Sequence, residues 1–210
     1  SPVRACEDVD DTALSYAEIK ALATGNPYIK EKMDLDVQVS KLKLLKANHT
    51  SQIYRLESDI AKNFPVQISA LKERIAGMQV DSQVVKSVDL QDNDTFAMTV
   101  GNVLYEDKKE AGEALIAACA GLKTVSTGGK VGEYHGFTLS ASYNMFSNAF
   151  ELTIKGKCSY KLEIGEDPVG NMQRIHNTLS SIDRKLTESE QKLETVQQQL
   201  ATAQEEVKKP

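Results

Sequence analysis

The sequence predicts an α+β fold in which a long antiparallel two-helix coiled-coil arm carries a small inserted β-β-α-β-β-β module. Apolar residues recur at steps of three and four over residues 27–84 and again over 168–210, which is the period of an amphipathic helix. Between these stretches, residues 85–167 contain short runs of alternating apolar and polar residues, as β-strands require. We therefore divide the chain into a linker with a short helix (1–26), a first helical arm (27–84), the α+β module (85–167) and a second arm helix (168–210).

The first 26 residues separate into an acidic linker and a short helix. Residues 1–14 are acidic and irregular, and the string SYAEIKALATG then predicts a helix that ends at Gly25. Asn26 is a good N-cap for a new helix, and Pro27 suits its first turn because a missing N–H costs no hydrogen bond there.

The first arm has one strong interruption, at Asn63-Phe64-Pro65. A proline inside a helix removes one backbone hydrogen bond and crowds the preceding turn, so we expect a kink near Pro65. The apolar stripe on either side of it consists of Leu35, Val39, Leu42, Leu45, Ile53, Leu56, Ile60, Phe64, Ile68, Leu71, Ile75 and Met78.

The module shows a change of period from about 3.6 to 2. Gly101-Asn102 separates DTFAMTV from NVLY and predicts a hairpin turn. Asp107 and Glu110 have capping-box spacing and begin a helix that ends near Gly121. Three strand candidates follow, GEYHGFTLSASYN, NAFELTIKG and CSYKLEIG. One buried face of the first is predicted to hold Phe137, Leu139, Ala141 and Tyr143.

The final helix, MQRIHNTLSSIDRKLTESEQKLETVQQQLATAQEEV, has an apolar stripe that needs a partner. We expect it to pair with the first arm of the same chain, and pairing between molecules is the alternative. Aligning residue 170 with residue 82 places Leu193 near Ile60 and Leu200 near Ile53. The shared arm would be roughly 50 Å long at about 1.5 Å per residue.

Composition limits the class of protein. The formal net charge of −5 argues against a chain that coats nucleic acid uniformly, but it permits a local basic patch. No apolar run reaches the roughly 20 residues that span a bilayer, and no signal peptide is present, so we expect a cytoplasmic protein without membrane partners. Three widely spaced cysteines, Cys6, Cys119 and Cys158, indicate reduced thiols. The Ser-Pro-Val start indicates a segment of a longer protein.

The residues do not assemble a catalytic site. The string TGGKVGE lacks the spacing and the Ser/Thr of a phosphate-binding loop, and GNPYIKE lacks the second proline of the Asn-Pro-Pro-Tyr element of adenine methyltransferases. His49, His135 and His176 lie in three different elements. Asp89, Asp92 and Asp94 lack the glycine and terminal glutamate of a calcium loop. We therefore predict no catalytic, cofactor-binding or metal-binding residue in this chain.

A basic stretch lies in the first arm. Its candidate DNA contacts are Lys41, Lys43, Lys46 and Arg55, which could follow a phosphate backbone electrostatically. The alternative is a solvated helix face, because Glu31, Asp34, Asp36 and Asp59 are mixed among the basic residues.

Long segments of the chain resemble one family. LSYAEIKALATGNPYIKEKMDLDVQVSKLKLLKANH resembles a segment just downstream of the motor in very large Swi/Snf-like superfamily II DNA helicases. Bacterial conjugative elements and phages encode these helicases, often fused to an adenine-specific DNA methyltransferase. MTVGNVLYEDKKEAGEAL, GEYHGFTLSAS and DPVGNMQRIHNTL resemble later pieces of the same region, in the same order.

The resemblance implies a C-terminal accessory region of a parent helicase that uses ATP and Mg²⁺, and S-adenosylmethionine where a methyltransferase is fused. The family's ATP-binding and methyl-transfer motifs have no counterpart here, so the chain itself would need no cofactor and have no enzymatic activity. Two functions remain open. The chain is either a structural arm that positions the motor or recruits a protein through the β module, or a DNA-contacting guide that uses the basic face of the first helix.

Overall fold

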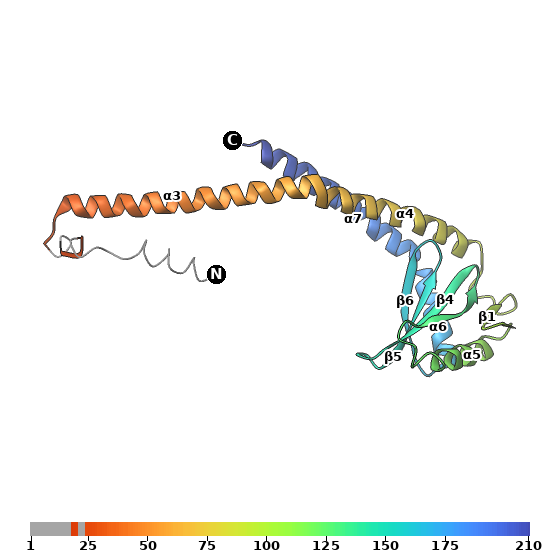
Figure 1. The fold of residues 1–210 in the computed structure, drawn as a ribbon. Coiled ribbons are helices and arrows are strands. Elements are labelled where there is room, and N and C mark those ends of the chain that lie inside the picture. Colours follow the sequence, from red (N-terminus) through yellow and green to blue (C-terminus); the bar gives the residue numbers. More distant parts are fainter. Residues whose placement is uncertain (1–17, 21–23) are drawn as a thin grey trace. The chain divides into compact units, whose positions relative to one another are not determined.

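The computed structural model describes residues 18–20 and 24–210, and the chain divides into two compact units (Figure 1). One unit comprises the described residues up to 63 together with 202–210, and the other comprises residues 64–201. The predicted acidic linker (1–14) lies outside the described residues. Of the predicted short helix, residues 18–20 are helical.

Helix α3 (Pro27–Ser58) begins where the sequence indicates. The Asn26 side chain accepts a hydrogen bond of 3.0 Å from the backbone N–H of Tyr28, and Pro27 occupies the first turn. No residue of α3 is buried, and every residue over 34–52 is exposed. This helix therefore presents its apolar residues as well as its charges.

The helical backbone continues through Pro65. A π-helical turn, η1 (Asp59–Asn63), separates α3 from α4 (Phe64–Lys86). Pro65 has no N–H to donate, and its ring crowds the preceding turn, so the wider π turn relieves both problems. Within the turn, the Asn63 side chain donates a 2.6 Å hydrogen bond to the Asp59 carboxylate. The interruption predicted at Pro65 thus takes the form of a π turn without a break.

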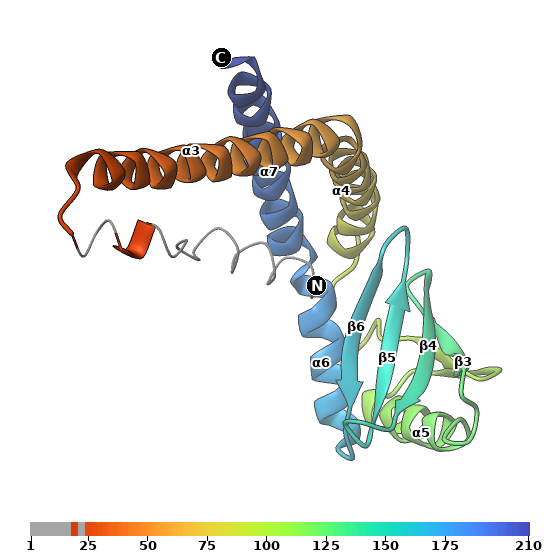
Figure 2. The same cartoon turned by 60° about the vertical axis from the view of Figure 1, so that its left-hand side comes forward.

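The module contains a six-stranded antiparallel sheet in the order β2-β1-β3-β4-β5-β6. Figure 2 shows β3, β4, β5 and β6 side by side, with α5 (Lys108–Ala120) and α6 (Pro168–Ser180) beside the sheet. The strands are β1 (Met98–Val100), β2 (Val103–Tyr105), β3 (Gly129–Tyr134), β4 (Phe137–Asn144), β5 (Ala149–Lys155) and β6 (Ser159–Ile164). The Gly101-Asn102 hairpin is confirmed, because Val100 pairs with Val103 and Gly101 has a φ of +61°. In β4, buried Phe137, Leu139 and Ala141 alternate with more exposed polar residues.

The sheet has one strand more than the sequence predicted. The alternating pattern of GEYHGFTLSASYN predicts a single strand, but the segment forms β3 and β4 joined by a tight turn at His135-Gly136. Both turn residues have positive φ, +48° and +82°, and this left-handed conformation matches the twist of a two-residue hairpin. The sequence did not predict this turn because His135 occupies its first position, where Asn or Asp is the usual residue.

Two helices complete the core of the module, α5 (Lys108–Ala120) and α6 (Pro168–Ser180). The predicted cap of α5 is confirmed: the Asp107 carboxylate accepts a 2.9 Å hydrogen bond from the Glu110 N–H, and Gly121 ends the helix. The buried residues of α5 pack with Met172, Ile175 and Leu179 of α6 in the core. The first third of the predicted arm stripe is therefore covered by the module.

The long helix pair is completed by α7 (Ile182–Lys208), which follows α6 after a one-residue interruption at Ser181. At the start of α7, the Asp183 carboxylate accepts a hydrogen bond from Ser82 and pairs with Lys86 at 3.3 Å. The predicted alignment placed residue 170 beside residue 82, whereas Asp183 lies there, so the predicted register is wrong by about three and a half helical turns. The predicted pairs Leu193–Ile60 and Leu200–Ile53 depended on that alignment, so they do not follow from the observed register. The cause is α6, which the module uses for its own core.

A glycine allows α5 and α6 to approach closely. A Cβ added to Gly112 would lie 2.4 Å from the backbone oxygen of Pro168, at the first turn of α6. We expect Gly112→Ala to lower the free energy of unfolding by about 1 to 3 kcal/mol, because the helices must separate to admit the methyl group. Urea denaturation followed by circular dichroism measures this change.

Gly121→Ala is the matched control for that variant. Gly121 lies at the other end of α5 with an ordinary φ of −64°, and an added Cβ would lie 3.4 Å from the nearest oxygen. We expect this substitution to leave stability unchanged or to raise it slightly. Equal effects at the two glycines would contradict the close approach at Gly112.

Candidate functional site

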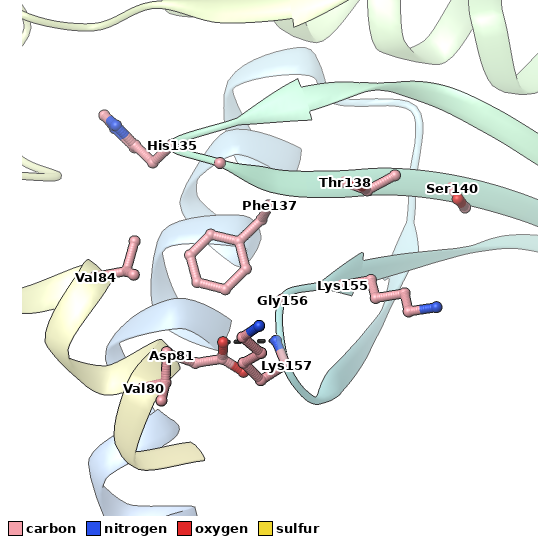
Figure 3. Close-up of a pocket in the computed structure, with 11 residues that line it drawn as sticks. Val80, Asp81, Val84, His135, Phe137, Thr138, Ser140, Lys155, Gly156 and Lys157 are labelled. Carbon is pink, nitrogen blue, oxygen red and sulfur yellow. Dashed lines mark hydrogen bonds between the residues drawn. The ribbon is translucent and has the colours of Figure 1, made fainter. Parts of the chain in front are cut away.

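A hollow of about 560 Å³ opens between α4, the β3–β4 turn and the β5–β6 turn (Figure 3). Helix α4 contributes an apolar wall, and Phe137 contributes an aromatic ring that points into the hollow (Figure 3). The remaining lining residues are polar or small, and they come from the two turns, from β4 and from the end of β5. They are His135, Gly136, Thr138, Ser140, Lys155, Gly156 and Lys157.

Asp81 of α4 is the buried charged residue of this hollow, with 2% of its surface exposed. One carboxylate oxygen accepts a 2.8 Å hydrogen bond from the Lys157 N–H. The other accepts bonds from the Cys158 N–H at 2.9 Å and the Tyr160 hydroxyl at 2.7 Å. A Cβ on Gly156 would lie 2.3 Å from this carboxylate. Both oxygens thus bind the backbone of the β5–β6 turn, and the second also binds Tyr160 of β6, so Asp81 joins α4 to the sheet.

The rim of the hollow carries cations and hydroxyls without an activating partner. Lys155 and Lys157 are exposed, and Lys155 pairs across the sheet with Thr138. Within the described part of the chain, Thr138 and Ser140 also line the hollow, and no hydrogen bond joins either of them to His135. The arrangement can attract an anion to two lysines, but it does not assemble a nucleophile, a base and an orienting group.

A second polar cluster lies inside the module, around Tyr134. The Tyr134 hydroxyl shares a 2.9 Å hydrogen bond with Nε2 of His176, and the His135 ring lies 4.3 Å from the Tyr134 ring. Burial raises the pKa of Tyr134 to about 12. Burial, and then the positive charge of Lys108, lower the pKa of His176 to about 4. The neutral pair is therefore favoured, and it links β3 to α6.

The acidic and glycine-rich strings have structural roles. Asp89 and Asp92 each accept a hydrogen bond from the backbone N–H two residues later, which stabilises their loop. Glu133 pairs with Lys130 at 2.5 Å on β3. Gly128 has a φ of +66° in a turn, and Gly129 begins β3, so no helix follows this string as it does in a phosphate-binding loop. In the part of the chain that the structure describes, no three His, Cys, Asp or Glu side chains gather to hold a metal ion.

The four candidate DNA contacts all lie on α3 and are all exposed. At about 100° per residue, Lys41 and Arg55 lie roughly 40° apart around the helix, and Lys43 and Lys46 roughly 60° apart on the other side. The structure therefore places them as two pairs rather than on one face. Among residues 18–20 and 24–210, no helix combines the length and apolar composition needed to cross a membrane.

Sequence reasoning missed Asp81 and the grouping of His135 with His176 around Tyr134. A signal for the first was present, because Asp81 and Ser82 occupy the stripe position that follows Met78 at a step of three or four. A charged residue on an apolar stripe indicates a buried partner. The histidine grouping depends on the β3–β4 turn, which the sequence did not reveal.

Comparisons with protein-family models, with curated proteins and with solved structures found no match for this chain. The resemblance to the helicase accessory region thus stays a prediction.

We expect Asp81→Ala to lower the free energy of unfolding by about 3 kcal/mol. The substitution leaves the N–H groups of Lys157 and Cys158 and the Tyr160 hydroxyl without their acceptor. Thermal and urea melts measure the loss. Asp92→Ala is the control, since its carboxylate accepts one backbone bond in an exposed loop and should cost less than about 1 kcal/mol. Similar losses at the two positions would contradict the role of Asp81.

The neutral His176 predicts a pH dependence of stability. The pKa of His176 is about 4 in the folded protein, against 6.5 for an ordinary histidine. As the pH falls, this histidine is therefore protonated in the unfolded chain before it is protonated in the folded protein, which favours unfolding. The contribution of neutral His176 to the free energy of unfolding is fully present above pH 6.5 and decreases between pH 6.5 and about 4. It amounts to about 3 kcal/mol at most. In urea melts across this window, the His176→Gln variant should lack this component, while exposed His49→Gln should retain it. Parallel pH profiles for wild type and His176→Gln would contradict the assignment.

Proposed function

We propose that this chain is a non-catalytic accessory and interaction region of a mobile-element DNA helicase. In this role it is a structural arm that positions the motor or recruits a partner protein. The resemblance of four segments to such helicases supplies the parent. The buried polar groups are hydrogen-bonded within the fold, and this commitment to structural roles supports a non-catalytic function.

That commitment is the observation that carries the proposal. Among the described residues, no buried side-chain nitrogen or oxygen lacks a hydrogen-bond partner. Both oxygens of Asp81 hold a backbone turn, and Asn171 exchanges two 2.9 Å hydrogen bonds with the backbone of Gly165. Catalytic sites usually leave an acid, base or nucleophile directed at the substrate. Here the same residue types stabilise the module.

An exposed apolar turn on the module supports a protein partner there. Met145 and Phe146 lie in the β4–β5 turn and are 83% and 103% exposed. The Asn144 side chain accepts hydrogen bonds from the N–H groups of Phe146 and Ser147, at 2.9 and 3.3 Å, so the turn is preorganised. Adjacent exposed large side chains on a rigid turn suit the centre of a protein interface, where aromatic residues supply much of the binding energy.

The alternative function, a DNA guide, is supported by the exposure of Lys41, Lys43, Lys46 and Arg55. Their division into two pairs allows one pair at a time to follow a phosphate backbone. Binding through so few cations would be weak and independent of DNA sequence.

Purified chain should neither hydrolyse ATP nor transfer a methyl group to DNA, and it should not bind duplex or single-stranded DNA at low salt. Fluorescence anisotropy with labelled DNA at low and at physiological salt measures the binding. DNA-stimulated ATP hydrolysis would contradict the proposal.

Binding that falls steeply with salt would favour the guide, since each neutralised phosphate releases counterions. Two double variants then identify the surface, Lys41→Glu with Arg55→Glu and Lys43→Glu with Lys46→Glu. A guide loses DNA binding in at least one of them without a change in its melt.

A further inference from the structure

Helix α3 carries an apolar stripe that the described residues leave uncovered. Leu35, Val39 and Leu42 follow one another at steps of four and three, and each is 47 to 65% exposed. Every residue over 34–52 is exposed on this helix. The stripe lies between Lys32 and Lys46, and an uncovered apolar stripe on a long helix is typical of a surface that another helix covers.

Two charged residues of opposite sign, Asp36 and Lys43, lie beside this stripe in an arrangement that suits two-fold symmetric pairing. At about 100° per residue, the three apolar residues fall within roughly 60° of one another around α3. In coiled-coil terms, Val39 occupies an a position and Leu42 a d position, which places Asp36 and Lys43 at successive e positions. The two e residues thus flank the stripe on the same side, with opposite charge and one heptad apart.

We propose that α3 pairs antiparallel with α3 of a second copy of this chain, about a two-fold axis between residues 40 and 41. In this pairing Val39 faces the second copy's Leu42, and the reciprocal contact forms on the other side of the axis. Asp36 faces the second copy's Lys43, also twice. One charge pattern therefore gives two salt bridges in the dimer, as an isologous interface requires.

Charge also selects the antiparallel direction. In a parallel pair, Lys32 and Lys46 would occupy a positions and meet their own copies in the seam. Glu31 would face the second copy's Asp36 across the g–e′ contact, which repels. The antiparallel pair replaces these repulsions with attractions, and Lys46 lies beside Leu35, where its alkyl stem covers apolar surface. This interaction goes beyond the proposed function, because it concerns a surface other than the β4–β5 turn.

Sedimentation of the full chain over a wide concentration range tests the proposal. Wild type should associate reversibly from monomer to dimer. Asp36→Lys and Lys43→Asp should each raise the dissociation constant about tenfold, because each turns two attractions into two repulsions. The double variant Asp36→Lys with Lys43→Asp should restore the wild-type constant, since the pairs re-form with exchanged charges. Lys41→Asp, on the opposite side of the helix, should have no effect.

Specific outcomes would overturn the dimer. A wild-type chain that stays monomeric at all concentrations does so, and so does a double variant that is weaker than both single ones. Equal effects of Lys43→Asp and Lys41→Asp would also overturn it, because both substitutions make the chain more negative by the same amount and only the first removes a predicted salt bridge. A monomeric chain would leave the accessory function intact, whereas ATP hydrolysis by the purified chain would contradict that function whatever the oligomeric state.

Discussion

The organisation of the module depends on one buried carboxylate. Asp81 comes from the end of a long helix and binds the turn between two strands that lie more than 70 residues later in the chain. The β5–β6 turn supplies the backbone N–H groups of Lys157 and Cys158, which have no partner on a neighbouring strand among the described residues. Tyr160 supplies a buried hydroxyl. Because a carboxylate can accept all three bonds at once, it fixes both the distance and the orientation of α4 against the sheet. Gly156 and Gly77 serve the same approach, since a Cβ at either position would collide with Asp81 or with Cys158.

Features set by local chemistry could be predicted from the sequence. The cap at Asn26, the cap at Asp107, the Gly101 hairpin and the interruption before Pro65 each depend on residues within one turn of each other. Features set by long-range packing could not. The final apolar stripe has the same period whether a sheet or another helix covers it, so the sequence could not separate α6 from α7. The predicted register of the helix pair was wrong because it treated α6 and α7 as one arm helix.

The candidate site shows the same division. Nothing local marks Asp81 as a turn-binding residue, because its partners are backbone groups that become neighbours only after the sheet has formed. His135 and His176 are 41 positions apart, and the tyrosine between them joins them through a hairpin that the pattern concealed. In contrast, the absence of a recognisable catalytic string could be read directly, since such strings are local. For this chain, sequence reasoning is therefore stronger on local strings than on buried contacts between distant residues.

The contact between Ser82 and Asp183 joins two residues that are 101 positions apart, on either side of the whole module. The chain therefore leaves the helix pair and returns to it at adjacent points. An insertion with neighbouring ends places little topological demand on its host, because a short linker could replace it without moving either helix. A graft of the module into a loop of an unrelated protein would have to carry the end of α4 with it, because Asp81 holds the β5–β6 turn and Met78 belongs to the module's core.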